Sequence, residues 1–352
     1  MNFFLICPLN FEKIVETELL HKFQLYFEKK PNYTLVDGGI EIECLAEEGL
    51  QLNYILKTPT RILLRIKEQK CRDFPKLYKI IQRIDWKKYT KRTDLNWSIT
   101  TKESRLINTK KMEETCNEAV QKYFNANSLS QKIIDQKEVF QKQTVFIRVN
   151  KDLIQISLDT SGDSLHVRGG EKFRGQASIR STIASCLLVN FLYKKQDIHL
   201  IDPMCGSGTF IKEALNFHKL NYNRSYAFED IVKFERMADS SHLFEIKSIA
   251  GFDNNHSIIK RNDQRIFKVR DVFSHKISSP NKYYIILNPP YGKRVKLNRP
   301  RNLYYTELIS SVQKNLNAQE ISIIIPTDIK IEVYKSRIKF FNSGIWLYNY
   351  II

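Results

Sequence analysis

The stretch that decides the fold is His199-Leu-Ile-Asp202-Pro-Met-Cys205-Gly206-Ser207-Gly208-Thr209-Phe210, in which an apolar strand runs into a glycine-rich turn. A segment with an apolar helical face follows at once. Glycines in such a turn let the backbone approach a ligand closely, and the first turn of a helix offers free N–H groups to an anion. The turn lacks the Lys-Ser/Thr ending of a phosphate-binding loop and the third glycine of the dinucleotide pattern. It therefore indicates a ligand loop at a strand–helix junction, but of neither of those two kinds.

Strands and helices alternate around this loop. The expected strands are 198–201, 248–253, 267–270, 283–287 and 321–325, and the expected helices are 179–194, 209–219, 255–266 and 302–315. Alternation of this kind predicts an α/β fold with a doubly wound, mainly parallel sheet. Residues 334–352 predict two further strands around Asn342-Ser343-Gly344, that is, a terminal antiparallel hairpin.

Two α+β units are predicted before this region. In residues 1–60 the pattern favours strands at 3–7 and 39–44 and a helix at 11–27. In residues 61–160 it favours strands at 61–67, 97–101, 144–149 and 153–158 and a helix at 112–124. The third unit, 161–352, contains the ligand loop.

Charge and cysteine usage narrow the class of protein. The 352 residues have a net charge of +18, which predicts attraction to a polyanion such as a nucleic acid. The apolar stretch 183–193 is shorter than the ~18–20 residues of a membrane-spanning helix, and the N-terminus does not resemble a signal peptide. The six cysteines are scattered and form no zinc-binding or disulfide pattern. We expect a cytoplasmic monomer with no metal and no membrane partner.

Acidic residues end the next two predicted strands. Asp253 follows the second strand, a position that binds ribose hydroxyls in doubly wound folds. Asp271 ends the third, where a carboxylate can accept from an adenine amino group while Val272 covers the ring. The predicted cofactor-binding residues are Asp202, Cys205, Gly206, Gly208, Thr209, Asp253, Asp271, Val272 and Asn288.

The fourth strand ends in the predicted catalytic residues Asn288, Pro289, Pro290 and Tyr291. The lone pair of a base amino group is delocalised into its ring, so the group is a poor nucleophile until its N–H groups are held. The Asn288 side-chain oxygen and the Pro289 carbonyl can each accept one N–H, and the prolines fix the backbone. Tyr291 offers a face on which an extruded base can stack, worth about 1–3 kcal/mol. Positioning, rather than a metal or a strong base, would supply most of the catalysis.

Together, Asp202-Pro-Met-Cys-Gly-Ser-Gly-Thr209 and Asn288-Pro-Pro-Tyr-Gly292 resemble the THUMP-domain RNA guanine-N2 methyltransferases, especially the bacterial large-subunit (23S) rRNA enzyme. Leu158–Gly169 resembles that family's junction between its THUMP and catalytic domains, and Thr101–Asn108 resembles its THUMP core. Lys293 departs from the pattern, because family members commonly have an acidic residue there.

The resemblance implies a ferredoxin-like domain at 1–60, a THUMP RNA-binding domain at 61–160 and a Rossmann-like class I methyltransferase domain at 161–352. It also implies S-adenosylmethionine as cofactor and the 2-amino group of a guanine in 23S rRNA as target. The alternatives are tRNA as substrate, an adenine 6-amino group in DNA, a glutamine amide in a protein, or RNA binding without catalysis. The motifs alone do not separate a guanine 2-amino from an adenine 6-amino target.

A basic run follows the catalytic loop and predicts a phosphate clamp. The residues predicted to contact RNA are Arg168, Lys293, Arg294, Lys296, Arg299 and Arg301.

Overall fold

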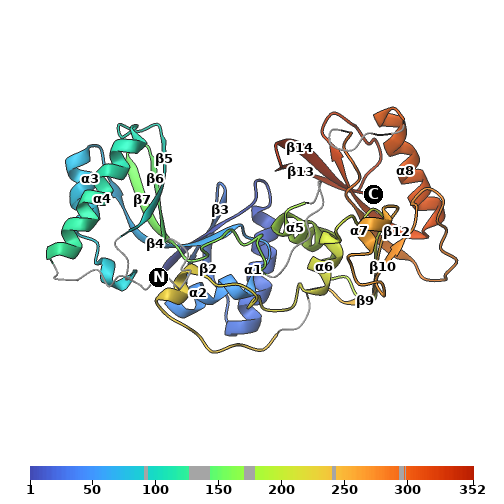
Figure 1. Cartoon of the computed structure of the whole chain (residues 1–352), viewed down its shortest axis with the longest axis horizontal. Coiled ribbons are helices and arrows are strands. Elements are labelled where there is room, and N and C mark those ends of the chain that lie inside the picture. The colour runs from blue at the N-terminus through green and yellow to red at the C-terminus, as the bar shows by residue number, and fades with distance from the viewer. Residues whose placement is uncertain (91–93, 127–142, 170–178, 240–242, 293–296, 298) are drawn as a thin grey trace.

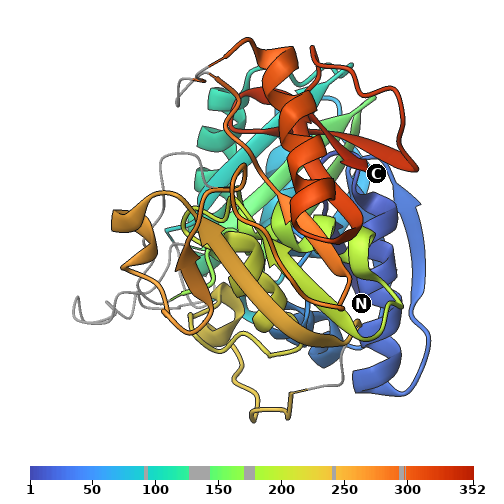
Figure 2. The same ribbon diagram turned by 90° about the vertical axis from the view of Figure 1, so that its right-hand side faces the viewer.

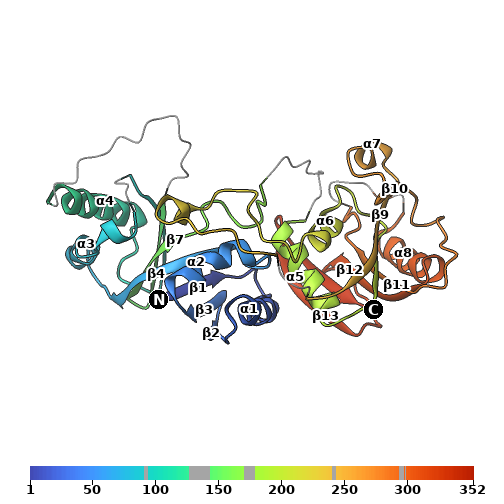
Figure 3. The ribbon, with the colours of Figure 1, turned by 90° about the horizontal axis from the view of Figure 1, so that it is seen from below.

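The computed structural model describes residues 1–90, 94–126, 143–169, 179–239, 243–292, 297 and 299–352. These residues form an elongated molecule built around two seven-stranded sheets (Figures 1 and 3). The first sheet contains β1 (Asn2–Ile6), β2 (Asn32–Val36), β3 (Gly39–Glu43), β4 (Arg61–Lys70), β5 (Asn96–Lys102), β6 (Thr144–Asn150) and β7 (Leu153–Asp159). Its helices are α1 (Glu12–Phe27), α2 (Ala46–Ile55), α3 (Phe74–Gln82) and α4 (Thr109–Ala126).

The first sheet has the strand order β2-β3-β1-β4-β7-β6-β5. Residues up to the end of β4 follow the βαββαβ order of a ferredoxin-like unit, with antiparallel neighbours throughout. Strand β4 begins just after the predicted boundary at residue 60 and pairs with β1 on one side and β7 on the other. The two expected N-terminal units therefore share one sheet, and their division into ferredoxin-like and THUMP domains stays a prediction.

The second sheet contains β8 (Ile198–Asp202), β9 (Ile246–Asp253), β10 (Phe267–Val269), β11 (Tyr283–Leu287), β12 (Ala318–Pro326), β13 (Ser336–Asn342) and β14 (Ile345–Ile351). Its helices are α5 (Ser181–Leu192), α6 (Thr209–Leu215), α7 (His256–Ile259) and α8 (Arg301–Asn315). Strands β8 to β12 pair in parallel, and β14 is antiparallel to both β12 and β13. The predicted doubly wound sheet with a terminal antiparallel hairpin is confirmed.

The strand order β10-β9-β8-β11-β12-β14-β13 reverses direction between β8 and β11. In open α/β sheets, ligands bind outside the carboxyl ends of the strands at such a switch point. The ligand loop follows β8 and the predicted catalytic loop follows β11. The topology therefore places the two loops side by side at one edge of the sheet.

Helices cover both faces of this sheet because side chains alternate along its strands. On β11, Ile285 and Leu287 join an apolar cluster with Leu308 of α8, whereas Ile286 joins the cluster that contains α5. Figure 2 shows α8 in front of the sheet. The α5 cluster also includes Phe11 and Phe23 of the N-terminal half, so one continuous apolar core joins the two halves.

Two predicted helices of the second sheet, 255–266 and 209–219, end well before the expected residue. The predicted helix 255–266 ends at Ile259, because side chains compete for the backbone groups that would continue it. The Gln264 amide donates to the Ile259 carbonyl at 2.7 Å, and Asp263 accepts from the Arg265 N–H at 3.0 Å.

The predicted helix 209–219 ends at Leu215. Beyond it, the carbonyl of Phe217 accepts from Lys22 of α1 at 3.1 Å, and the ring lies 4.5 Å from the same ammonium. This segment therefore bonds to the N-terminal half instead of continuing the helix.

Candidate functional site

The loop after β8 has a backbone that only glycine adopts without strain. Gly206 and Gly208 have φ angles of +52° and +80°. A Cβ on Gly208 would lie 2.5 Å from the ring of Phe267, whereas one on Gly206 would meet nothing within 4 Å. The loop is thus packed tightly against β10 at Gly208 and borders open space at Gly206. Helix α6 begins at Thr209, immediately after it.

Asp253 holds this loop in place. One of its carboxylate oxygens accepts from the Gly206 N–H at 2.9 Å, and the other accepts from the Asn255 N–H at 2.9 Å. The Cys205 N–H donates to the Phe252 carbonyl at 2.8 Å, a second bond between the loop and β9. The structure therefore brings the predicted cofactor residues Gly206 and Asp253 together, although they lie far apart in the sequence.

Two carboxyl groups lie at the carboxyl ends of β8 and β9. Asp202 is 1% exposed, and its Oδ1 accepts from the Met204 N–H at 3.1 Å. Burial, together with the neighbouring charge of Asp253, raises the pKa of Asp202 well above its ordinary value. The pKa of the Cys205 thiol is also raised, mainly by burial and to a smaller extent by the charges of Asp202 and Asp253. A raised pKa favours the protonated form of a carboxyl or thiol, so burial favours the uncharged forms of Asp202 and Cys205.

Asp271 and Val272 follow β10 but differ in exposure. Asp271 is exposed, and its side chain accepts from the Phe273 N–H at 3.1 Å. Val272 is buried in the apolar cluster that contains Phe252 and Tyr304. The acidic residue is thus open to a ligand, while its apolar neighbour is part of the protein core. The predicted adenine contacts stay a prediction.

Two tyrosine hydroxyls bond to the predicted catalytic loop. Half-buried Asn288 follows β11, and the Tyr291 hydroxyl donates to its side-chain oxygen. The Tyr305 hydroxyl of α8 donates to the Pro290 carbonyl at 3.1 Å. Burial raises the pKa of Tyr291, so its hydroxyl stays protonated and remains a donor. Tyr305 is a site residue that the sequence reasoning missed, since nothing in the Tyr304-Tyr305 pair indicates a bond to a loop before the helix.

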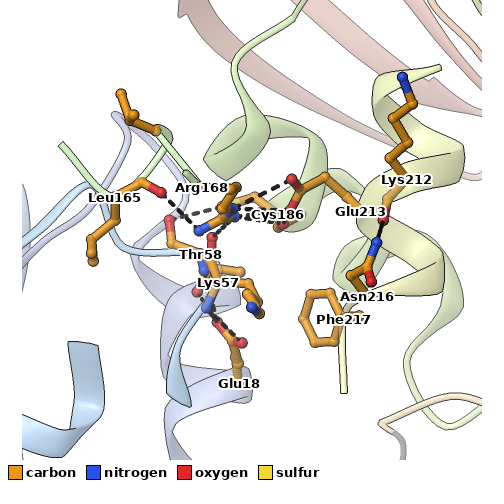
Figure 4. A network of polar contacts seen from close by, with 12 residues as sticks. Glu18, Lys57, Thr58, Leu165, Arg168, Cys186, Lys212, Glu213, Asn216 and Phe217 are labelled. Atoms are coloured by element: carbon orange, nitrogen blue, oxygen red, sulfur yellow. Dashed lines mark hydrogen bonds and ion pairs between the residues drawn. The ribbon is translucent and has the colours of Figure 1, made fainter. Parts of the chain in front are cut away.

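Arg168, which was predicted to contact RNA, has its guanidinium bonded within the protein, and an RNA contact by this residue stays a prediction. Its side chain is 12% exposed, and it donates to Glu213 of α6 at 2.9 Å, to the Lys57 carbonyl at 2.7 Å and to the Leu165 carbonyl at 2.9 Å. It also donates to the Ser185 hydroxyl of α5 at 3.2 Å. Figure 4 shows the guanidinium of Arg168 between Leu165, Lys57 and Glu213. The side chain therefore joins the N-terminal half to α5 and α6, and we call this set of contacts the Arg168 joint.

A second buried pair extends this contact. The Glu18 carboxylate of α1 accepts from the Lys22 ammonium at 2.7 Å and from the N–H of Thr58 at 2.8 Å. Lys57, between these groups and Arg168, is almost fully buried. Its burial, with the positive charges of Arg168 and Lys22, lowers the pKa of Lys57 to about 7.

The predicted phosphate clamp is described only in part. Lys293, Arg294 and Lys296 lie outside the described residues. The Arg299 guanidinium forms an ion pair with Glu307 and lies 5.1 Å from the centre of the Phe273 ring. Arg301 forms a bidentate pair with Asp328 at 2.5 and 3.1 Å. Acidic residues from other segments thus offset both described charges, and an RNA contact by either stays a prediction.

Neither a metal centre nor a membrane span is found in the described part of the chain. No group of three or more His, Cys, Asp or Glu side chains there could hold a metal ion. None of the helices in the described ranges has the length and apolar character needed to cross a membrane.

Comparison with known proteins identifies relatives of both the sequence and the fold. The Psychromonas ingrahamii protein named ribosomal RNA large subunit methyltransferase K/L is 28% identical over 313 residues, which are 78% of this chain and 40% of that protein. The chain thus spans less than half the length of this relative. The fold is that of SMU.472, crystallised in complex with SAH, with a TM-score of 0.77, 20% identity and 100% and 97% of the two chains covered. TrmN from Thermus thermophilus aligns with a TM-score of 0.68, 12% identity and 99% and 98% covered.

The family match covers the second sheet up to the start of β13. Residues 168–337 match the RMKL-like methyltransferase domain, which confirms the methyltransferase resemblance expected from the sequence. The match includes the predicted ligand loop after β8, the strand end at Asp253 and the predicted catalytic loop after β11. Residues 168–337 of the chain are thus similar in sequence to RMKL-like methyltransferase domains.

Proposed function

We propose that this chain methylates the 2-amino group of a guanine in RNA, with 23S rRNA as the substrate and S-adenosylmethionine as the methyl donor. One observation supports the proposal most strongly. The loop after β8, bonded through Gly206 to Asp253, and the loop of Asn288 to Tyr291 after β11 both lie at the switch point of the sheet. The match to an RMKL-like methyltransferase domain and the +18 charge of the chain favour the same function.

The residues around the loop after β8 fit S-adenosylmethionine. Open space beside Gly206 leaves room for a ligand against the backbone. The oxygens of Asp253 each accept one backbone N–H, and a carboxylate has about four lone-pair sites, so capacity remains for ribose hydroxyls. The exposed carboxylate of Asp271 can accept from an adenine amino group. When bound, the cofactor supplies an electrophilic methyl group on a positively charged sulfur, and the sulfur keeps the electron pair of the broken S–C bond.

Asn288 is the residue proposed to hold the target amino group. Its side-chain oxygen accepts from the Tyr291 hydroxyl. In the proposed arrangement that oxygen also accepts an amino N–H of the base, and the Pro289 carbonyl is the other acceptor. In that arrangement Tyr291 fixes the amide orientation, a role that the sequence interpretation of Tyr291 as a stacking face did not include. The nitrogen lone pair forms the new N–C bond, and the amino group then loses one proton to water.

Single-turnover methylation of RNA tests this assignment. Asn288→Ala should lower the rate by roughly 10²–10³, as the loss of a preorganised polar partner does elsewhere, with RNA affinity unchanged. Tyr291→Phe removes the hydroxyl and keeps the ring, so it should lower the rate while leaving RNA affinity intact. Tyr33→Phe is the matched control, because the Tyr33 hydroxyl bonds Glu16 in the N-terminal half at 2.6 Å. A near-normal rate for Asn288→Ala would rule out the mechanism.

The substrate requires a separate measurement. Nucleoside mass spectrometry and primer extension on rRNA and tRNA from a deletion strain should show loss of one N2-methylguanine in 23S rRNA. Loss of a methylated adenine, or of a tRNA modification, would contradict the proposed target.

A further inference from the structure

The β13–β14 hairpin has two different faces. On the inner face, Phe340 and Leu347 are 0% exposed, and the ring of Phe340 lies 5.5 Å from that of Phe11 in the N-terminal half. Because side chains alternate along a strand, the neighbours of Phe340 and Leu347 point to the opposite face. The inner face thus needs no further partner, and the outer face is the one that requires explanation.

The outer face presents large rings to solvent. The strand register places Phe341 opposite Trp346 and Lys339 opposite Tyr348. Phe341 is 47% exposed and Trp346 is 40% exposed, with 5.3 Å between their ring centres. We call the set Arg337, Lys339, Phe341, Trp346 and Tyr348 the hairpin platform. Exposed apolar rings grouped on one face commonly mark an interaction site.

Positive charge is interleaved with these rings. The Lys339 ammonium lies 4.8 Å from the centre of the Trp346 ring, and the Arg337 guanidinium lies 4.8 Å from that of Tyr348. Residues 333–352 contain Lys335, Arg337 and Lys339 and no acidic residue. Lys335 pairs with Glu320 at 2.6 Å, but neither platform cation has a carboxylate within ion-pair distance among the residues that the structure describes. Aromatic faces beside unneutralised cations are typical of surfaces that bind single-stranded nucleic acid.

The platform lies at the catalytic edge of the second sheet. Leu287, the residue before Asn288, pairs in parallel with Ile323 of β12. Further along β12, Pro326 pairs with Leu347, so the hairpin turn lies beyond the carboxyl end of β12. Trp346 and Phe341 are therefore at the same end of the sheet as Asn288. Strand β12 lies between β11 and the β14 strand of Trp346, and β12 and β14 lie between β11 and the β13 strand of Phe341.

We propose that the hairpin platform binds an unpaired stretch of the RNA substrate. Trp346 and Phe341 stack on bases, while Lys339 and Arg337 contact the phosphates on either side. Base faces are buried in a duplex, so this surface selects single-stranded RNA next to the nucleotide that enters the catalytic loop. This inference rests on the proposed function in one respect, which is that the substrate is RNA.

Fluorescence anisotropy with the full chain tests the proposal. The probes are a fluorescein-labelled oligouridylate and an RNA duplex of equal length. Phe341→Leu combined with Trp346→Leu keeps apolar volume and removes both rings, so it should weaken oligouridylate binding about tenfold or more and leave duplex binding unchanged. Trp346→Phe, which keeps a ring, should retain most of the affinity.

Two controls separate the platform from other effects. Lys339→Gln should weaken oligouridylate binding more than Lys314→Gln, which removes one exposed charge from α8 at a site outside the platform. S-adenosylmethionine binding measured by calorimetry should be unchanged in every platform variant, which reports an intact fold.

Wild-type oligouridylate affinity in the double leucine variant would overturn the proposal and leave the assignment of Asn288 untouched. A wild-type dimer, seen by sedimentation, that the same variant dissociates would also overturn it, because a second copy would then cover the face.

Discussion

Replacing Arg168 by glutamine should destabilise the protein severely. The side chain is 12% exposed and donates to the Glu213 carboxylate, to the Ser185 hydroxyl and to the carbonyls of Lys57 and Leu165. Glutamine is shorter and uncharged, so the variant leaves Glu213 as an unpaired charge in a buried position. Breaking a buried ion pair in this way costs about 3–5 kcal/mol. That is a large share of the 5–15 kcal/mol by which a typical domain is stable.

Urea denaturation followed by tryptophan fluorescence measures this loss. Trp86 and Trp97 report on the N-terminal half and Trp346 on the second sheet, so both sides of the joint contribute to the signal. Arg265→Gln is the matched control, because Arg265 pairs with Asp263 at 2.7 Å on the exposed surface, and its midpoint should not move.

A double-mutant cycle tests the cause. In Arg168→Gln combined with Glu213→Gln no charge is left unpaired, so the loss should be smaller than the sum of the two single losses. Surface ion pairs typically contribute less than about 1 kcal/mol. A stability loss of that size for Arg168→Gln would refute the claim that its pair with Glu213 is a buried contact that stabilises the protein.

The same pair predicts a pH dependence with a defined sign. Burial alone would raise the pKa of Glu213, but the charge and hydrogen bonds of Arg168, with help from Lys57 and Ser185, lower it overall. A lowered folded-state pKa contributes stability above the unfolded value of about 4.3, and this stability is lost as the pH falls through the folded pKa. In Arg168→Gln, burial is no longer opposed and protonation of Glu213 relieves the penalty. The stability difference between the two proteins should therefore shrink as the pH falls from 7 towards 4.

Three further variants test the joint and the cofactor loop. The pKa of Lys57 is lowered to about 7 in the folded protein, so between that pH and about 10.4 the unfolded chain binds more protons than the folded one. The wild type should therefore gain stability as the pH rises through this window. Lys57→Met should flatten that rise in urea denaturation measured at several pH values. Gly208→Ala should abolish cofactor binding in calorimetry, because the backbone has a φ of +80° and the new Cβ would lie 2.5 Å from the Phe267 ring, whereas an unchanged Kd would mean that the loop adapts. Asp253→Ala should weaken S-adenosylmethionine binding by about 1–3 kcal/mol, the cost of poorly paired hydroxyls, and unchanged affinity would remove it from the site.

Much of the second sheet could be predicted because its strands are short apolar runs that end in glycine, proline or acidic residues. The predicted strand 283–287 matches β11 residue for residue, and β8 extends the predicted 198–201 by one residue. The prediction was wrong for the helix at 255–266, where periodicity of apolar residues continued but Gln264 and Asp263 bonded the backbone locally. Side-chain bonds of this kind depend on rotamers that a hydrophobic pattern does not contain.

The residues of the predicted ligand loop after β8 could be identified from the sequence, but the contacts between them could not. The sequence pattern alone placed Gly206 and Asp253 at the ends of two strands. The structure adds that the Gly206 N–H donates to the Asp253 carboxylate at 2.9 Å. The close approach of Phe267 to Gly208 and Gly251 has no local signal, because it comes from a strand that pairs with β9. Contacts of this type follow from sheet register, which is set by the whole fold.

Arg168 shows why a basic residue near a catalytic motif is hard to assign from sequence. Besides the nearby Leu165 carbonyl, its acceptors are at Lys57, Ser185 and Glu213, and nothing near Arg168 in the chain indicates these three. Their meeting has a consequence for function. Helix α6 begins at the end of the cofactor loop and contains Glu213, so the Arg168 joint fixes that loop relative to the N-terminal half. If residues 1–160 bind the RNA, this joint sets the distance between the bound RNA and Asn288. Because misplacement by about 1 Å costs roughly 10²-fold in rate, a buried charge far from the methyl group would then determine how often transfer occurs.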